Sequence, residues 1–225
     1  MRIENDIKLD FNDVMIKPKR SALVSRADVD LIRTYKFLHC KDEWSGCPVI
    51  AANMDSCGVF GIAEKLIKHN MLTALHKHYS VEELIAFFNE GHSNVWNRVF
   101  CSVGMSGNDL EKLEEIRIDE RMDEETGADW FPHMINIDVA NGYSQNFIDR
   151  VVEARNSFPR SIIMAGNVVT PNMVEELLLS GADIVKVGIG SGAVCQTRIV
   201  AGVGYPQLSA VMECADAAHG LGGHV

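Results

Sequence analysis

The sequence lacks any run of 18 consecutive apolar residues, the length that a helix needs in order to cross a bilayer. Its first six residues also lack the apolar segment of a signal peptide. The six cysteines include no Cys-x-x-Cys pair, and neither they nor the eight histidines have the spacing of a zinc site or a disulfide framework. These absences predict a cytoplasmic protein with reduced thiols and no membrane partner.

Basic residues are in the minority, with 21 Lys and Arg against 31 Asp and Glu and a net charge of −10. Because proteins bind nucleic acid largely by neutralising its phosphates, an acidic chain without a basic stripe predicts no nucleic-acid partner. A single nucleotide needs only a local site of backbone amides, so the net charge is compatible with a small phosphorylated ligand. The length of 225 residues and the hydrophobic share of 47% predict a single domain with one core.

Beyond an N-terminal arm, residues 1–45, short apolar runs alternate with segments of helical periodicity. The runs are apolar at nearly every position, which is typical of parallel strands that are buried on both faces. Six consecutive βα units predict an α/β fold with a parallel sheet, either curled as a barrel or open and doubly wound, and a seventh strand could begin at 223–225. The predicted strands cover 48–53, 72–76, 99–103, 134–139, 162–166 and 184–188, and the predicted helices cover 59–69, 80–90, 107–118, 143–158, 171–180 and 206–219.

Several predicted helix positions have a chemical reason. Thr170 precedes a proline and suits the N-cap of the helix that follows. Gly181 comes shortly after a run of leucines and suits the left-handed residue that ends the same helix. Phe147, Val151 and Ala154 recur at helical spacing and are expected to face the sheet.

Polar and glycine-rich residues follow the predicted strands, at the end of a parallel sheet where active sites form. The richest such segment runs from Lys186 to Arg198 and places three alternating glycines before Cys195. These glycines let a ligand approach the backbone closely, and carbonyls in such a loop could ring a monovalent cation. Cys195 is a candidate nucleophile whose thiolate needs help from backbone dipoles or a nearby base. The alternative is a tight turn with Cys195 as a buried, small apolar residue.

The cysteine segment resembles the catalytic loop shared by IMP dehydrogenases and GMP reductases. Five further segments, and two in the arm, resemble GMP reductase, so that the resemblance covers nearly the whole chain. It implies a TIM-type (β/α) barrel in one domain, residues 1–225, that holds about six of the eight βα units and lacks the family's C-terminal third. The segments are 51–55, 76–79, 137–143, 165–170, 202–211, 8–11 and 18–21.

By this resemblance the chain reduces GMP to IMP and ammonia, with NADPH as the hydride source. Cys195 would be the nucleophile that adds to carbon 2 of the purine, and Thr197 would transfer protons with the help of a partner group. Lys77 and Asp138 would act beside the cofactor. Each has a plainer alternative, namely a turn-stabilising hydroxyl for Thr197, a solvated loop lysine for Lys77 and a helix cap for Asp138.

The resemblance also implies further ligand sites and a homotetramer. Ser25 and Arg26 match an arm segment that reaches the NADPH of a neighbouring subunit. The implied cofactor contacts within the chain are Lys77, Asp138, Val139, Ala140, Ile189 and Gly190. The implied potassium ligands are Gly190, Gly192, Cys195 and Arg198.

The cysteine segment departs from the family at Ser191, Ala193 and Gln196, where proline, serine and threonine are usual, and these changes bear on GMP affinity. An IMP dehydrogenase-type oxidoreductase is the second hypothesis, although residues 80–98 leave no room for the regulatory domain which that family usually inserts. The third is a catalytically incomplete nucleotide-binding fragment or pseudoenzyme, motivated by the missing strands and by Ala193. The acidic stretch 119–129 is expected to form an extended, solvated loop.

Overall fold

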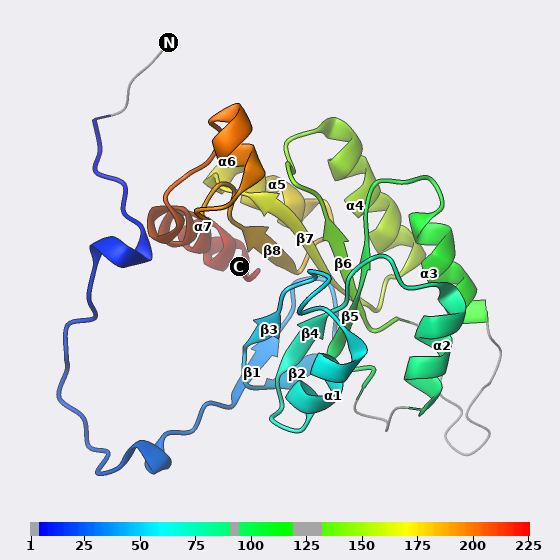
Figure 1. Cartoon of the computed structure of the whole chain (residues 1–225), viewed down its shortest axis with the longest axis horizontal. Helices are drawn as coiled ribbons and strands as arrows, with labels where there is room; N and C mark the ends of the chain where they lie inside the picture. The colour runs from blue at the N-terminus through cyan, green and yellow to red at the C-terminus, as the bar shows by residue number, and fades with distance from the viewer. Residues whose placement is uncertain (1–4, 91–94, 119–131) are drawn as a thin grey trace.

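The computed structural model describes residues 5–90, 95–118 and 132–225, and its centre is a curled parallel sheet of six strands. The strands lie in the order of the sequence, and every neighbouring pair is parallel (Figure 1). A doubly wound sheet reverses its strand order, so this sequential order is that of a (β/α) barrel with six strands in place. The strands are β3 (Ile50–Ala51), β4 (Leu72–Ala74), β5 (Val99–Val103), β6 (Met134–Asp138), β7 (Ile162–Val168) and β8 (Ile184–Val187).

Helices alternate with the strands and cover the outer face of the sheet (Figure 1). The six predicted helices are confirmed, with small shifts at their ends. Sequence reasoning missed a further one, α6 (Gln196–Ala201), which begins directly after Cys195 and ends at Gly202, where φ is +64°. The acidic stretch 119–129 lies outside the described residues, so its loop stays a prediction. The predicted helices are α1 (Phe60–Ile67), α2 (Val81–Glu90), α3 (Asp109–Ile118), α4 (Gln145–Ser157), α5 (Pro171–Leu179) and α7 (Gln207–Leu221).

The first strand of the sheet is shorter than predicted, with two residues in place of the range 48–53. The chain turns directly after β3, because the Met54 amide donates to the Ala52 carbonyl (2.8 Å) and the Gly58 amide donates to the Met54 carbonyl (2.7 Å). Asn53 therefore lies in the loop at the carboxyl end of the sheet and not within a strand.

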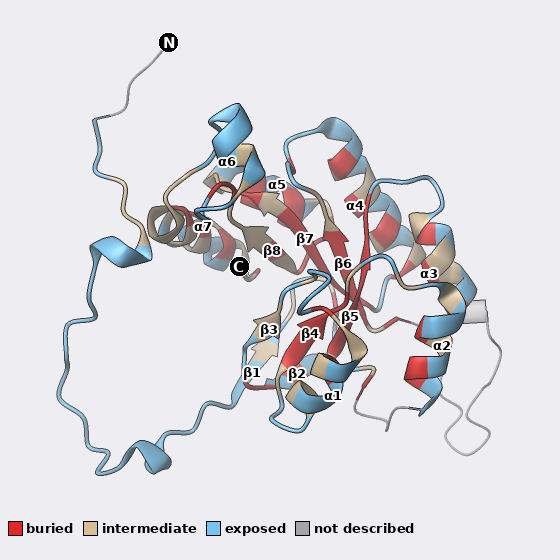
Figure 2. Ribbon diagram, in the orientation of Figure 1, coloured by how far each residue is buried: buried red, intermediate tan, exposed pale blue. Residues whose placement is uncertain are grey.

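The main core lies between the sheet and its helices, and β4 to β7 are buried along most of their length, whereas β3 and most of β8 are half-buried (Figure 2). All five residues of β5 are buried, which a strand covered on both faces requires. The apolar stripe of α4 faces this core as its spacing predicts. Its fully buried residues are Phe147, Val151 and Ala154.

The two ends of α5 test the predicted caps. Gly181 has a φ of +121°, its amide donates to the Leu178 carbonyl (3.2 Å), and the next amide donates to the Leu177 carbonyl (3.0 Å). These two bonds satisfy carbonyls that the helix leaves open, so the predicted glycine at the end of α5 is confirmed. Thr170 is the N-cap residue, but its hydroxyl contacts the Tyr143 hydroxyl (3.0 Å) and caps no amide.

The predicted arm contains a β-hairpin that sequence reasoning did not assign. Its strands, β1 (Arg33–Lys36) and β2 (Glu43–Gly46), pair antiparallel, and Trp44 packs with strand residues at the amino end of the sheet. The rest of the arm holds two 3₁₀ turns, at Phe11–Asp13 and Arg26–Asp28, and much of it runs clear of the sheet (Figure 1).

The segment after α7 returns to the free edge of β8. The Val185 amide donates to the His224 carbonyl (2.8 Å), and the His224 amide donates to the Asp183 carbonyl (3.1 Å). Ile184 and His224 thus form a parallel bridge. This pairing is what the start of a seventh parallel strand at 223–225 requires.

A buried ion pair joins the amino ends of the last strands to the hairpin. Asp183, just before β8, is fully buried, and its Oδ2 accepts from Arg155 Nη2 at 2.6 Å and from the Ile163 amide at 3.0 Å. Its Oδ1 accepts from the amides of His39 (2.9 Å) and Cys40 (3.4 Å). One carboxylate therefore connects α4, β7 and the connection between the hairpin strands.

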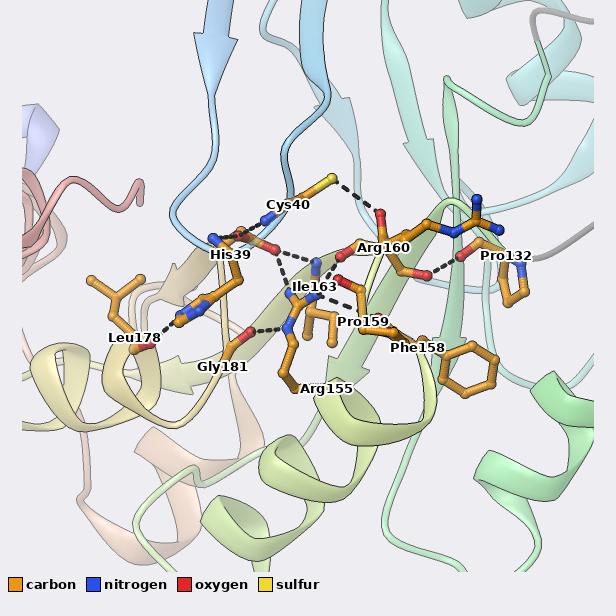
Figure 3. A network of polar contacts seen from close by, with 12 residues as sticks. His39, Cys40, Pro132, Arg155, Phe158, Pro159, Arg160, Ile163, Leu178 and Gly181 are labelled. Carbon is orange, nitrogen blue, oxygen red and sulfur yellow. Dashed lines mark hydrogen bonds and ion pairs between the residues drawn. The ribbon is translucent and has the colours of Figure 1, made fainter. Parts of the chain in front are cut away.

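The Arg155 guanidinium is as fully hydrogen-bonded as the carboxylate (Figure 3). Its Nε donates to the Gly181 carbonyl at 2.9 Å, and its Nη1 donates to the Ser161 carbonyl at 2.8 Å and to two more carbonyls in the turn after α4. His39 adds a contact of 2.7 Å between its Nε2 and the Leu178 carbonyl. Removing one partner of such a pair leaves a buried charge uncompensated, which is strongly destabilising.

Asp183→Asn is expected to lower the free energy of unfolding by about 3–5 kcal/mol, because Arg155 keeps its buried charge and loses its counterion. Urea denaturation followed by tryptophan fluorescence measures this loss. The matched control is Glu153→Gln, which removes the ion pair between Arg150 and the exposed Glu153 (3.3 Å) and is expected to cost less than about 1 kcal/mol. Equal losses in the two variants would show that Asp183 anchors no more than a surface ion pair does.

Candidate active site

The loops at the carboxyl ends of the strands lie along one rim of the sheet, because parallel strands end on the same side. This rim gathers Lys77 from the loop after β4, Asp138 from the end of β6 and Cys195 from the segment after β8. Ser25 and Arg26 lie instead at an exposed 3₁₀ turn of the arm, where Ser25 is the N-cap. Their implied role concerns a neighbouring subunit, so it stays a prediction.

The Asp138 carboxylate contacts the Lys186 ammonium, which also donates to Asn53 Oδ1 at 2.9 Å. Asp138 and Lys186 both pair in register with Gly166, so the three residues form one row across β6, β7 and β8. A Cβ at Gly166 would come within 2.6 Å of the Lys186 Cβ, so the glycine makes room for the lysine. Sequence reasoning gave Lys186 no role, because the register that brings it to Asp138 is not visible in either strand alone.

The structure excludes the plainer alternative for Asp138 but not the one for Lys77. A helix cap at Asp138 is wrong, because the N-cap of α4 is Ser144, whose Oγ accepts from the Phe147 amide at 3.3 Å. Lys77 is exposed, and its ammonium lies beside Gly104, where a Cβ would come 3.4 Å from it. Within the described ranges no carboxylate forms an ion pair with Lys77. Its position is compatible with a cofactor contact and with a solvated lysine.

Cys195 stands at the start of α6 and is only partly buried, so the alternative of a buried apolar cysteine is wrong. Hydrogen bonds lower the pKa of the Cys195 thiol, and the largest contribution comes from the backbone of Arg198. Desolvation opposes this change, while the backbone of Thr197 and Gly190 and the Thr197 hydroxyl lower the pKa further. Hydrogen bonds from the backbone therefore provide the stabilisation that a thiolate at Cys195 needs.

Burial has the opposite effect on three other thiols. It raises the pKa of Cys101 to about 12 and that of Cys214 to about 11, and it also raises the pKa of Cys40. These thiols stay protonated at neutral pH and react slowly with an electrophile. Cys195 is thus set apart from them both by its exposure and by the direction in which its pKa is shifted.

The carbonyls implied as potassium ligands all lie between Gly190 and Arg198. Those of Gly192 and Cys195 each accept an amide at 3.0 Å. The Arg198 carbonyl accepts the Gly202 amide at 3.1 Å, and the Gly190 carbonyl accepts the Arg198 guanidinium at 3.4 Å. A second lone pair remains on each oxygen, and a pocket of about 200 Å³ adjoins Gly190 and Arg198. Carbonyl oxygens are the ligands that potassium takes in proteins, so the donor chemistry of these residues is compatible with the ion.

The backbone just beyond Asp138 is fixed to β7. The Val139 amide donates to the Gly166 carbonyl (2.8 Å), and the Val139 carbonyl accepts the amide of Asn167 (2.9 Å). Ala140 follows in an exposed position, whereas Ile189 is buried and its carbonyl accepts an amide at 3.0 Å. Asn167, to which sequence reasoning gave no role, has a buried Oδ1 without a hydrogen-bond partner among the described atoms.

Two other classes of feature are absent from the part of the chain that the structure describes. No helix there has the length and apolar character of a membrane span. No group of three or more His, Cys, Asp or Glu is placed to hold a metal ion. A potassium site at the carbonyls between Gly190 and Arg198 would be of a separate kind, because its ligands would come from the backbone.

Comparison with known proteins supplies three findings. The model of the IMP dehydrogenase / GMP reductase domain family matches residues 8–225. GMP reductases of Shigella boydii serotype 4 (strain Sb227) and Escherichia coli (strain K12 / DH10B) are 55% identical over 227 residues, which cover 100% of this chain and 62% of theirs. The crystal structure of inosine 5′-monophosphate dehydrogenase from Legionella pneumophila has a TM-score of 0.75 and 31% identity, over 93% of this chain and 59% of that one.

Iodoacetamide at neutral pH is expected to label Cys195 before the buried thiols, because the lowered pKa leaves more thiolate. Thr197→Val removes a hydroxyl that lowers this pKa, so the labelling midpoint should move to higher pH. Labelling rates across a pH series, read by mass spectrometry of the Cys195 peptide, measure both effects.

Cys57→Ser is the control for this labelling, because it removes another thiol of the rim loops, an exposed one, and should leave the Cys195 profile unchanged. A Cys195 midpoint at or above that of free cysteine, about 8.5, would contradict the activation of this thiol.

Proposed function

The chain belongs to the IMP dehydrogenase / GMP reductase family, and from this premise we propose that it carries the catalytic cysteine of a GMP reductase. The supporting observation is the partly exposed Cys195 at the rim, whose pKa is lowered by hydrogen bonds from its own loop. A stabilised thiolate suits attack on an electron-poor carbon. The likeness to enzymes named GMP reductase favours GMP over IMP as the substrate. The chain spans 62% of the length of these relatives, so the activity of the whole protein is part of the proposal.

The proposed reaction converts GMP, NADPH and two protons into IMP, ammonium and NADP⁺. The Cys195 thiolate adds to carbon 2 of the purine, and a carbon–sulfur bond forms. The bond from carbon 2 to the exocyclic nitrogen then breaks, and ammonia leaves with the aid of a proton. The bound cofactor supplies the hydride that carbon 2 receives. Cleavage of the carbon–sulfur bond returns Cys195 to the thiolate.

Protons for the leaving ammonia come from side chains at the rim in this proposal. Thr197 supports the thiolate through its hydroxyl and relays protons together with a partner group, because a lone hydroxyl is a poor acid or base. The Lys77 ammonium, which has no carboxylate partner among the described residues, stabilises negative charge near the reacting centre. Asp138 places a carboxylate on the cofactor side of the rim.

We assign NADPH and one potassium ion to this rim as cofactors. The ion would be held by the carbonyls of Gly190, Gly192, Cys195 and Arg198, where it would fix the loop that carries the nucleophile. The backbone beyond Asp138 is already tied to β7, so it offers a rigid edge for the nicotinamide. The NADPH contacts are Lys77, Asp138, Val139, Ala140, Ile189 and Gly190 in one chain, with Ser25 and Arg26 from a neighbour.

A cytoplasmic homotetramer completes the proposal, with neither a membrane nor nucleic acid as a partner. The arm supports an assembly, because Met15 and Ile16 leave 97% and 96% of their surface exposed. Large apolar side chains in a row mark a surface that another chain covers. Ser25 lies in the same arm, which is how one subunit would reach the cofactor of the next.

Oxidation of IMP is the second candidate, and the likeness to a solved IMP dehydrogenase favours it. Both reactions begin with attack of a cysteine on carbon 2, but hydride leaves that carbon in the one and arrives in the other. The third candidate is a chain that binds nucleotide without turnover. Ala193 motivates it, because this residue is exposed in the segment that would face GMP and lacks the hydroxyl that is usual there in the family.

GMP and NADPH are expected to give a loss of reduced-nicotinamide absorbance, which Cys195→Ser lowers at least about 10³-fold because a serine hydroxyl is not ionised at neutral pH. Cys57→Ser is the control and should retain the rate. IMP with NAD⁺ tests the opposite reaction, and turnover with that pair alone would overturn the proposal. Tight nucleotide binding with no turnover of either pair would support the third candidate.

Removal of potassium is expected to lower GMP turnover at least about tenfold, because the carbonyls around Gly190 then repel one another. Tetramethylammonium, which is too large for such a ring, serves as the replacement ion and keeps the ionic strength constant. Readdition of potassium should restore the rate. Equal rates in the two salts would refute the potassium site and leave the role of Cys195 standing.

A further inference from the structure

Lys186 has no role in the proposed reaction, yet its ammonium connects two residues of the rim, Asp138 and Asn53. It contacts the Asp138 carboxylate and donates to Asn53 Oδ1 at 2.9 Å. The side chains of Lys186 and Asp138 are 20% and 29% exposed, so water screens this pair less than a surface pair. The contact with Lys186 therefore restricts the orientation of the Asp138 carboxylate more than a contact with an exposed lysine would.

The sheet itself builds this contact. Gly166 of β7 pairs with Asp138 on one side and with Lys186 on the other, so the charged residues lie two strands apart at the same height. Any side chain at Gly166 would collide with Lys186, because a Cβ there would lie 2.5 Å from the Lys186 carbonyl oxygen and 2.6 Å from the Lys186 Cβ. The glycine thus opens a path along which the lysine crosses β7 and reaches Asp138.

Asn53 fixes the other side of the ammonium. It follows β3, the strand at the far end of the sheet from β8. A lysine on β8 reaches both Asn53 and Asp138 only from the concave side of the curled sheet, where the ends of the sheet approach each other. Two of the three N–H donors of the Lys186 ammonium are occupied in this way. Most of its hydrogen bonds therefore go to protein groups and not to a substrate.

We propose that Lys186 is a positioning residue that holds the Asp138 carboxylate in one orientation at the rim and acts on the reaction only through Asp138. This inference rests on the proposed function, in which Asp138 borders the nicotinamide. A carboxylate that loses its counterion turns toward water, and a small misplacement of a catalytic group has a large kinetic effect. Lys186 itself touches neither nucleotide in this arrangement.

A double-mutant cycle tests the proposal in the enzyme. Lys186→Met is expected to lower kcat at least about 30-fold and to leave the KM for GMP within about threefold, because orientation and not GMP binding is lost. In the presence of Asp138→Asn, the same substitution should change kcat by less than about threefold. Lys186→Arg should recover most of the rate, because it keeps both the charge and the reach.

The matched control is Lys36→Met, which removes an ion pair of 3.0 Å with Glu43 in the hairpin at the other end of the sheet. This variant should keep the wild-type rate. Asn53→Ala is the milder probe if Lys186→Met does not fold. It removes the second anchor of the ammonium, so kcat should fall about threefold to tenfold, and this loss should vanish in the presence of Asp138→Asn.

NADPH binding, followed by the fluorescence of reduced nicotinamide, gives a readout that needs no turnover. Lys186→Met and Asp138→Asn should each weaken binding at least about threefold, and the double variant should bind no more weakly than the weaker single variant. Independent losses that multiply, in binding or in kcat, would show that Lys186 acts on its own and would overturn the inference.

The two readouts separate the failure of this inference from the failure of the proposed function. If the wild-type enzyme reduces GMP and Lys186→Met reduces it equally well, the inference fails and the function stands. If the wild-type enzyme reduces no GMP but the NADPH losses do not multiply, the function fails and the coupling of Lys186 to Asp138 stands. If Lys186→Met leaves NADPH binding unchanged, the inference fails whatever the substrate.

Discussion

The buried carboxylate of Asp183 is the constraint from which the arrangement of the last strands follows. Taking a carboxylate out of water is costly, and only a full set of hydrogen bonds offsets that cost. Arg155, two arm amides and the Ile163 amide provide this set. Because Asp183 directly precedes β8 and Ile163 belongs to β7, satisfying one charge also aligns the two strands at their amino ends.

Alignment at the amino ends also fixes which residues pair at the carboxyl ends of the strands, because all residue pairs of two parallel strands share one register. Ile184 pairs with Met164 near the anchor, and Lys186 then pairs with Gly166 at the rim. A slip of one residue would turn Lys186 to the opposite face, away from Asp138. The hydrogen bonds of Asp183 at the amino ends of the strands, and the contact between Asp138 and Lys186 at their carboxyl ends, thus both depend on one strand register. The side chains at the rim are placed as they are because Asp183 fixes the amino ends of β7 and β8.

These dependencies explain how much the sequence alone could predict. Helical periodicity and the runs of apolar residues locate the βα units, since each is a local pattern, and Gly181 marks a helix end for a local reason. Periodicity does not predict helix α6, because this helix is short and buries none of its residues, so it has no apolar stripe. The β1–β2 hairpin and Lys186 escape prediction because their roles depend on residues far away in the chain, such as the strand residues that Trp44 packs against. Sequence reasoning found Cys195 and Asp138, and only the strand register could find the contact between Asp138 and Lys186.

Cys195, the proposed nucleophile, is attached to α6, a helix in which no residue is buried. Val194, Ile199 and Val200 leave 84%, 62% and 80% of their surface exposed, so little buried apolar area holds α6 in place. A segment with so few buried contacts unfolds locally at small cost. The hydrogen bond that most lowers the pKa of Cys195 comes from Arg198 within this helix, so unwinding α6 would return the thiol toward its ordinary pKa. By linkage, a ligand that packs against the exposed side chains stabilises both the helix and the thiolate. Asp138 ends a strand of the sheet, whereas the lowered pKa of Cys195 depends on the local folding of α6, so ligand binding against α6 and the pKa of Cys195 would be thermodynamically coupled.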